Sequence, residues 1–378
     1  MEDNLRHMWD VVDNPAKWLV GWKEVNKRRI IGCAPMFVPE EIVHAAGALP
    51  VVLWEGSEPI TLAHNRIQLF FCGIARGIVD LVLKRELDFL DGIIIPDICL
   101  PMRYLPGVMQ FNSAFPFQFV AYLPHDSRRP SAKPFLVEEL GRLRSKLAEF
   151  MGVEISDDSL RRSIQVYNGH RALLRRLYEL RRKNPGVLKA GEMMAVVASG
   201  MVMPKEGHSR LLAELLPELE ARKPAMLEGP RLILSANLCE WPKQDILDLI
   251  EDLGGVVVDD EMYVGRRYFT TDADSASPIE GLADAYLNMA IPNPIAMDPT
   301  NRWGDYLLKM ARDNQAQGVI SLTVKYCEPH GLFYPDLAGK LSQAGIPHLM
   351  LEIEHEVVSW GQFKTRIQAF LETLRRKK

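Results

Sequence analysis

The chain has 378 residues, of which 47% are hydrophobic and 25% charged, with a formal net charge of −4 and a pI near 6.2. This length favours two domains, and the composition is that of a globular protein rather than a disordered one. The slight acidity argues against the basic surface that binds nucleic acids or anionic membranes. Because residues 1–20 contain no continuous apolar run, we expect no signal peptide or membrane anchor, and hence a cytoplasmic protein.

The first third of the chain alternates short apolar runs with segments of helical spacing. The runs predict strands at 28–32, 49–54, 91–96 and 117–123. Helices are expected at 40–47, just after Pro39, and at 72–87. This alternation is typical of a parallel sheet covered by helices, so residues 1–133 are predicted to form an N-terminal α/β domain that carries Cys72 and Cys99.

Residues 134–224 are rich in Arg and Leu and predict a helical bridge, with Asp157 and Asp158 capping one of its helices. We interpret its charge runs as solvated helix faces. The apolar runs resume with strands expected at 231–237, 254–261, 318–324 and 345–354, and with a closing helix near 361–375. The predicted fold class is therefore α/β, with two Rossmann-like parallel-sheet domains joined by a helical segment, the second covering residues 225–378 and carrying Cys327.

Five cysteines are spread over the chain, namely Cys33, Cys72, Cys99, Cys239 and Cys327. An odd number at wide spacing does not fit a disulfide framework. Cys99 and Cys327 each follow the carboxyl end of a predicted strand, where ligands bind in open α/β sheets. Both are followed two residues later by proline, as is Cys33. Cys72 opens a predicted helix, and the positive end of a helix favours a thiolate.

Residue patterns alone leave two interpretations of these cysteines open. Buried structural thiols are one, because free cysteine is among the most buried residue types. Ligation of a metal or a cluster is the other, although the spacing matches no compact zinc or iron–sulfur pattern. The sequence contains no G-x-x-x-x-G-K-[ST] loop, no H-E-x-x-H and no G-x-S-x-G. We therefore expect that this chain is not an ATPase, a zinc-dependent hydrolase or a serine hydrolase.

Four blocks of sequence resemble the superfamily of 2-hydroxyacyl-CoA dehydratases and benzoyl-CoA reductases. They lie at 38–51, 70–99, 238–261 and 318–329. The resemblance implies a 4Fe-4S cluster held by Cys72, Cys99 and Cys327, with Cys33 and Cys239 outside the ligand set. The helix sequence VYNGHRALLRRLYELRRKNPG and the block ending in VVVDDE are most similar to the smaller subunit of ATP-dependent benzoyl-CoA reductases.

This resemblance also implies partners and a reaction. The partners would be a homologous subunit with its own cluster, a separate ATP-hydrolysing iron–sulfur activator and an acyl-CoA substrate. The reaction would be reductive dearomatisation of an aromatic acyl-CoA. Alternatively, the chain would belong to a 2-hydroxyacyl-CoA dehydratase that uses ketyl-radical chemistry, or would serve only as an electron relay or scaffold.

Several polar residues near these blocks are weaker candidates. Glu41 could carry protons near the cluster, or could simply be an acid in the first turn of a helix. Glu328 could accept a proton or tune the cluster, or could be a solvated loop acid. Possible contacts with the acyl-CoA carbonyl or phosphates, or with its nucleotide part, are His330, Arg103, Tyr263, Arg266 and Arg267.

Overall fold

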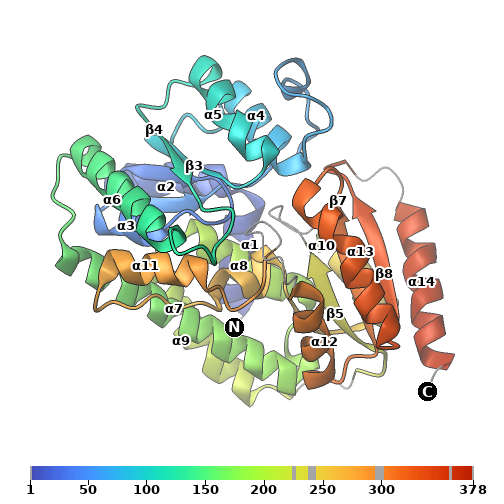
Figure 1. Cartoon of the computed structure of the whole chain (residues 1–378). Coiled ribbons are helices and arrows are strands. Elements are labelled where there is room, and N and C mark those ends of the chain that lie inside the picture. Colours follow the sequence, from blue (N-terminus) through green and yellow to red (C-terminus); the bar gives the residue numbers. More distant parts are fainter. Residues whose placement is uncertain (1, 224–226, 237–243, 294–301, 357–359, 377–378) are drawn as a thin grey trace.

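The computed structural model describes residues 2–223, 227–236, 244–293, 302–356 and 360–376 (Figure 1). Its strands form two four-stranded sheets, and every strand pairing is parallel. The first sheet contains β1 (Ile30–Cys33), β2 (Leu49–Val52), β3 (Gly92–Asp97) and β4 (Phe117–Tyr122), and the second contains β5 (Arg231–Ala236), β6 (Val256–Asp260), β7 (Gly318–Val324) and β8 (His348–Ile353). The predicted α/β class with two parallel sheets is confirmed.

The two sheets share one topology. The first has the order β2-β1-β3-β4 and the second the order β6-β5-β7-β8, so both run second, first, third, fourth along the chain. The central strands β1 and β3 are buried at every residue, as expected for strands covered on both faces. The order reverses between the first and third strands of each sheet, and this switch point is where α/β sheets open a crevice for ligands.

Each sheet is flanked by helices from its own part of the chain. In the first part these are α3 (Glu40–Ala45), α4 (Gly73–Leu83) and α5 (Leu100–Asn112). In the second they are α10 (Gln244–Asp252), α12 (Trp303–Asp313), α13 (Glu328–Gln343) and α14 (Trp360–Arg376), of which α13 and α14 pack on β8. Helix α3 begins directly after Pro39, as predicted.

The helical segment between the sheets consists of α6 (Ala132–Met151), α7 (Asp157–Lys183), α8 (Ala190–Val202) and α9 (Lys205–Ala221). Helix α7 packs on α3 of the first sheet and on β6 of the second, so it joins both. The predicted cap of α7 was wrong by one residue: Ser156 is the N-cap and accepts the Ser159 backbone N–H, while Asp157 and Asp158 occupy the first turn. Helix α8 is buried along its length.

Two further helices, α1 (Glu2–Asp13) and α11 (Pro278–Leu287), pack against this segment, and α2 (Pro15–Asn26) packs on α1. The N-terminal helix α1 contacts α8. Helix α11 follows β6 in the chain but packs against α6 and α7. One continuous apolar core therefore reaches from Val51 of the first sheet to Ile320 of the second. None of the described helices combines the length and apolarity needed to cross a membrane.

Candidate functional site

Three of the five cysteines occupy the same local position, directly before the first residue of a helix. Cys72 is the N-cap of α4, Cys99 that of α5 and Cys327 that of α13. At this position the first backbone N–H groups of a helix have no intrahelical partner, and the helix dipole adds a partial positive charge. All three cysteines therefore lie beside the partial positive charge of a helix N-terminus, which favours a thiolate wherever burial and nearby acids do not outweigh it.

One cavity of about 390 Å³ borders these three helix starts. Its walls include Cys327 itself, Phe71 beside Cys72, and Leu100 beside Cys99. The remaining wall residues come from the same loops and from β7 and β8, and are Phe70, Pro101, Thr323, Val324, Lys325, Tyr326, Glu328, Gly331 and Glu352. The cysteine loops of the two sheets thus meet at one cavity, at the edge where the carboxyl ends of the parallel strands lie.

The Cys99 thiol responds to groups from both sheets. Burial raises its pKa, the carboxylates of Glu328 and Asp97 add to this rise, and the backbone N–H of Met102 opposes it, leaving the pKa at about 11. A thiol in this environment stays protonated at neutral pH unless a metal displaces the proton.

Cys327 makes a specific contact inside its own helix. Its Sγ lies 3.5 Å from Nδ1 of His330, whose side chain is only 3% exposed. Burial lowers the pKa of His330 well below the usual range for histidine, and Arg267 lowers it further. Because the imidazole is enclosed, it is not placed to meet an acyl-CoA phosphate from solvent, which was one of the roles considered for it.

The donor set fits a cluster better than it fits a single ion. Within the described residues, no three His, Cys, Asp or Glu side chains are gathered closely enough to hold one metal ion. A cluster, by contrast, bonds its thiolates to different iron atoms, so its ligands surround a volume instead of a point. Cys327 lines the cavity, and the residues next to Cys72 and Cys99 line it too, so the three helix starts border one volume, as such a group requires.

The remaining cysteines differ from these three. Cys33 is the last residue of β1 and is buried, and its pKa is raised well above the usual thiol range by burial and by the nearby Glu40. Neither Cys33 nor the residues next to it line the cavity, whereas Cys327 and the neighbours of Cys72 and Cys99 do. Cys239 lies outside the described residues.

The weaker candidates fall into separate places. Glu328 lines the cysteine cavity and is exposed. Arg103 is about half exposed and forms an ion pair of 2.9 Å with Asp97. Arg266 pairs with Asp259 and Arg267 with Glu261, so both arginines are held by buried acids.

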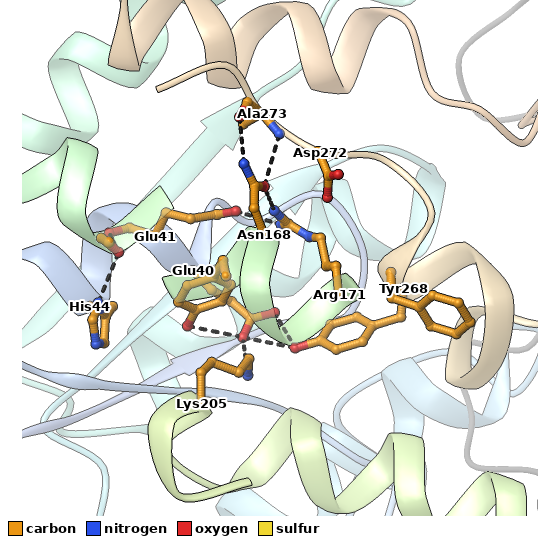
Figure 2. Close-up of polar contacts among 12 residues, drawn as sticks. Glu40, Glu41, His44, Asn168, Arg171, Lys205, Tyr268, Asp272 and Ala273 are labelled. Atoms are coloured by element: carbon orange, nitrogen blue, oxygen red, sulfur yellow. Dashed lines mark hydrogen bonds and ion pairs between the residues drawn. The ribbon is translucent and has the colours of Figure 1, made fainter. Parts of the chain in front are cut away.

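Glu41 lines a second cavity, of about 90 Å³, between α3, α7 and residues 263–293. Figure 2 shows its carboxylate beside the guanidinium of Arg171, and the two form an ion pair. Burial alone would lower the pKa of Arg171, but the Glu41 carboxylate outweighs it and raises that pKa. Glu41 is therefore an ion-paired wall residue of a cavity distinct from the one beside the cysteines.

The neighbouring Glu40 anchors the same network, and the sequence did not single it out. Its carboxylate accepts a hydrogen bond of 2.9 Å from Lys205 Nζ and bonds of 2.9 and 3.0 Å from the Tyr268 hydroxyl (Figure 2). The interpretation of the bridge's charges as solvated faces was wrong for Arg171 and Arg181, which are largely buried. In the sequence, the only sign of this buried network is the pair of adjacent acids, Glu40 and Glu41, that follows Pro39.

The fold and this site define a class: an α/β protein with two equivalent parallel sheets whose cysteine-bearing loops meet at one cavity. The chain belongs to the family described as 2-hydroxyglutaryl-CoA dehydratase, D-component, which it matches over residues 35–374. The superfamily resemblance found in the sequence is therefore confirmed.

Individual relatives cover nearly the whole chain. A benzoyl-CoA reductase subunit of Thauera aromatica is 32% identical, with 87% of this chain and 86% of the relative aligned. The (R)-phenyllactyl-CoA dehydratase beta subunit of Clostridium sporogenes is 29% identical over 97% of both chains. The (R)-2-hydroxyglutaryl-CoA dehydratase beta subunit of Acidaminococcus fermentans is 29% identical over 96% of both. Subunits of reductases and of dehydratases thus resemble this chain to a similar degree.

Proposed function

We propose that this chain is the iron–sulfur subunit of an ATP-dependent aromatic acyl-CoA reductase of the benzoyl-CoA type. It would hold a 4Fe-4S cluster through Cys72, Cys99 and Cys327. The observation that supports this proposal is the placement of these three cysteines at three helix N-termini whose loops border one cavity, which Cys327 itself lines. The 32% identity to one of the subunits of a benzoyl-CoA reductase supports the reaction, reductive dearomatisation in anaerobic aromatic degradation.

The chain's own residues supply the ligands and their surroundings. The three helix N-termini stabilise negative charge on the sulfur atoms. When bound, the cluster would supply one-electron transfer at low potential. The side chains of Phe70, Leu100 and Tyr326 border the cavity and lower the local polarity. Hydrophobic surroundings of this kind control solvent access to a metal site and influence its potential.

Partners are part of the proposal. The relatives are named as subunits, which supports a homologous, cluster-bearing partner subunit for this chain. The sequence has no G-x-x-x-x-G-K-[ST] motif, so ATP hydrolysis is assigned to a separate iron–sulfur activator. The acyl-CoA substrate would bind to the assembled enzyme.

A dehydratase is the second candidate, and the family match and the phenyllactyl-CoA relative favour it specifically. In that case the chain would help to remove water from a 2-hydroxyacyl-CoA without net consumption of electrons. A third reading, in which this chain only relays electrons or acts as a scaffold, predicts that a Cys99→Ala complex binds substrate fully but does not turn over.

Electron stoichiometry separates the first two candidates. The anaerobic complex of this chain, its partner subunit and the activator is given ATP and a one-electron donor, with benzoyl-CoA or a 2-hydroxyacyl-CoA such as phenyllactyl-CoA. The reductase proposal predicts donor oxidation in proportion to benzoyl-CoA converted, and loss of this activity in the Cys327→Ala complex. Conversion of phenyllactyl-CoA with far less donor oxidised than substrate consumed, and no conversion of benzoyl-CoA, would instead establish the dehydratase. A Cys33→Ala complex is the matched control and should retain activity.

A further inference from the structure

The contact between His330 and Cys327 is the starting point. His330 lies one helical turn after Cys327 in α13, and its Nδ1 faces the cysteine sulfur at 3.5 Å, within range of a hydrogen bond to sulfur. The imidazole is buried, so water does not compete for this nitrogen. The pair therefore forms a fixed contact directly behind the wall of the cysteine cavity.

A chain of buried contacts fixes the orientation of this imidazole. The ring of Trp303 meets it edge-to-face, with ring centroids 5.3 Å apart and planes at 88°. The Trp303 indole N–H donates to Glu261 Oε1 at 2.9 Å. Glu261 in turn accepts a hydrogen bond of 2.7 Å from Ser235 and pairs with Arg267. Residues from β5, the end of β6 and α12 thus hold His330 in place.

We propose that His330 is a positioning residue that donates its Nδ1–H to the Cys327 sulfur when that sulfur is a metal-bound thiolate. A metal-bound thiolate has lost its proton, so the hydrogen in this contact must come from the imidazole. A neutral imidazole carries one N–H, which places it on Nδ1 and leaves Nε2 as an acceptor. This inference rests on the proposed cluster and adds a role that its ligands alone do not define.

Such a bond changes the electronic properties of the site. A donor to a ligating sulfur withdraws electron density, and hydrogen bonds to sulfur are one of the main influences on cluster reduction potential. The bond favours the reduced, more negative state, so it raises the potential. Removing the donor should lower the potential of the bound cluster while leaving its three thiolates intact.

An equilibrium redox titration of the anaerobic complex, followed by electron paramagnetic resonance, tests this. His330→Phe keeps a ring against Trp303 but removes the donor, whereas His330→Asn keeps an N–H near the position of Nδ1. His330→Phe is expected to need about a tenfold higher ratio of reductant to oxidant for half-reduction, a shift of ~59 mV to lower potential for one electron. His330→Asn should titrate close to the unmodified protein.

A control variant accompanies this titration, and the results that would overturn the role of His330 differ from the result that would overturn the proposed function. His348→Phe removes a 2.8 Å contact between His348 of β8 and Tyr334 of α13, the helix that also carries His330. It leaves Cys327 untouched and should not shift the potential. Equal potentials for His330→Phe and the unmodified protein, or equal shifts for Phe and Asn, would overturn the inference. If His330→Phe does not retain its cluster, Trp303→Phe is titrated instead, because it removes the indole N–H bond to Glu261 that helps to orient His330. An unchanged cluster potential in Trp303→Phe would then overturn the inference. Absence of any cluster in the unmodified protein would count against the proposed function itself.

Discussion

Cys99 and Glu328 come from loops of different sheets and are coupled electrostatically. Burial raises the pKa of the Cys99 thiol, and the Glu328 carboxylate raises it further, to about 11. Cys99 follows β3, and Glu328 is the first residue of α13, the helix that follows β7. The coupling therefore joins equivalent ends of the two sheets. The acid at the start of α13 therefore influences a proposed ligand that lies far away in the sequence.

Replacing Glu328 by Gln removes this negative charge. In the metal-free protein we expect the pKa of the Cys99 thiol to fall and its alkylation by iodoacetamide to speed up at pH 8 to 9, because only the thiolate reacts. Mass spectrometry of the Cys99 peptide measures this rate. Glu354→Gln, at an acid paired with Lys325, is the control. An unchanged alkylation rate in Glu328→Gln would show that the two groups are not coupled.

The buried ion pair of Glu40 and Lys205, beside the second cavity, should contribute strongly to the free energy of unfolding of the protein. Both side chains are under 10% exposed, and removing one partner leaves an uncompensated buried charge. Lys205→Met is expected to cost roughly 3–5 kcal/mol of unfolding free energy. The double variant Glu40→Gln, Lys205→Met should cost less than the sum of the single changes. Urea unfolding of all four proteins tests this, and strictly additive losses would exclude a coupled pair.

A buried pair of histidines gives the protein a defined acid sensitivity. His208 Nδ1 lies 2.8 Å from His170 Nε2, and burial, with Lys205 adding to it, lowers the pKa of His208 to about 3. In the unfolded chain His208 takes up a proton near pH 6.5, whereas in the folded protein it does so only near pH 3. Its contribution to the free energy of unfolding is therefore present above pH 6.5 and is lost as the pH falls toward 3. This group alone should cost about 2 kcal/mol at pH 5 relative to pH 7.

Urea unfolding at pH 7 and pH 5 measures that loss. His208→Gln preserves hydrogen-bonding groups but cannot titrate in this range, so its stability should depend less on pH than that of the unmodified protein. The exposed His64 provides the control, and His64→Gln should leave the pH dependence unchanged. The same pH dependence in all three proteins would contradict a neutral, buried His208.

Gly200 makes room for this histidine pair. A Cβ at Gly200 would lie 3.0 Å from the His208 ring and 3.2 Å from His170 Nε2. Gly200→Ala should therefore destabilise the protein by about 1–3 kcal/mol, despite the higher helix propensity of alanine. Gly207, also helical, has only the end of the Arg210 side chain near its Cβ position. Thermal or urea unfolding should thus show Gly207→Ala to be neutral or stabilising, and equal effects at both glycines would refute the packing argument.

The sequence predicted the strands well because their signals are local. Runs of apolar β-branched residues such as 91–96 and 318–324 mark strands buried on both faces, and the structure places β3 and β7 there. Cys99 and Cys327 were predicted to follow such runs, and they do, whereas a position at the start of a helix was predicted only for Cys72. Here the chain's local pattern and the geometry of parallel sheets were sufficient.

Features that depend on distant parts of the chain could not be predicted. The partners of Arg171 and Lys205 lie more than a hundred residues away in α3, and no local pattern indicates that these cations are buried. The packing of α11 on α6 joins segments from opposite sides of the predicted boundary at 224 and 225. Helices α1 and α2 also escaped prediction, because residues 1–20 were assessed only as a possible leader or anchor.

The most direct test of the central claim is anaerobic analysis of iron and acid-labile sulfide, with electron paramagnetic resonance of the reduced protein. The unmodified chain is compared with Cys72→Ala, Cys99→Ala and Cys327→Ala, and with Cys33→Ala as the matched buried control. We predict about four irons per chain in the unmodified and Cys33→Ala proteins, and loss of the cluster signal in the other three. Iron-free protein from strictly anaerobic preparation, with the three variants merely less stable, would contradict the account and return these cysteines to a structural role.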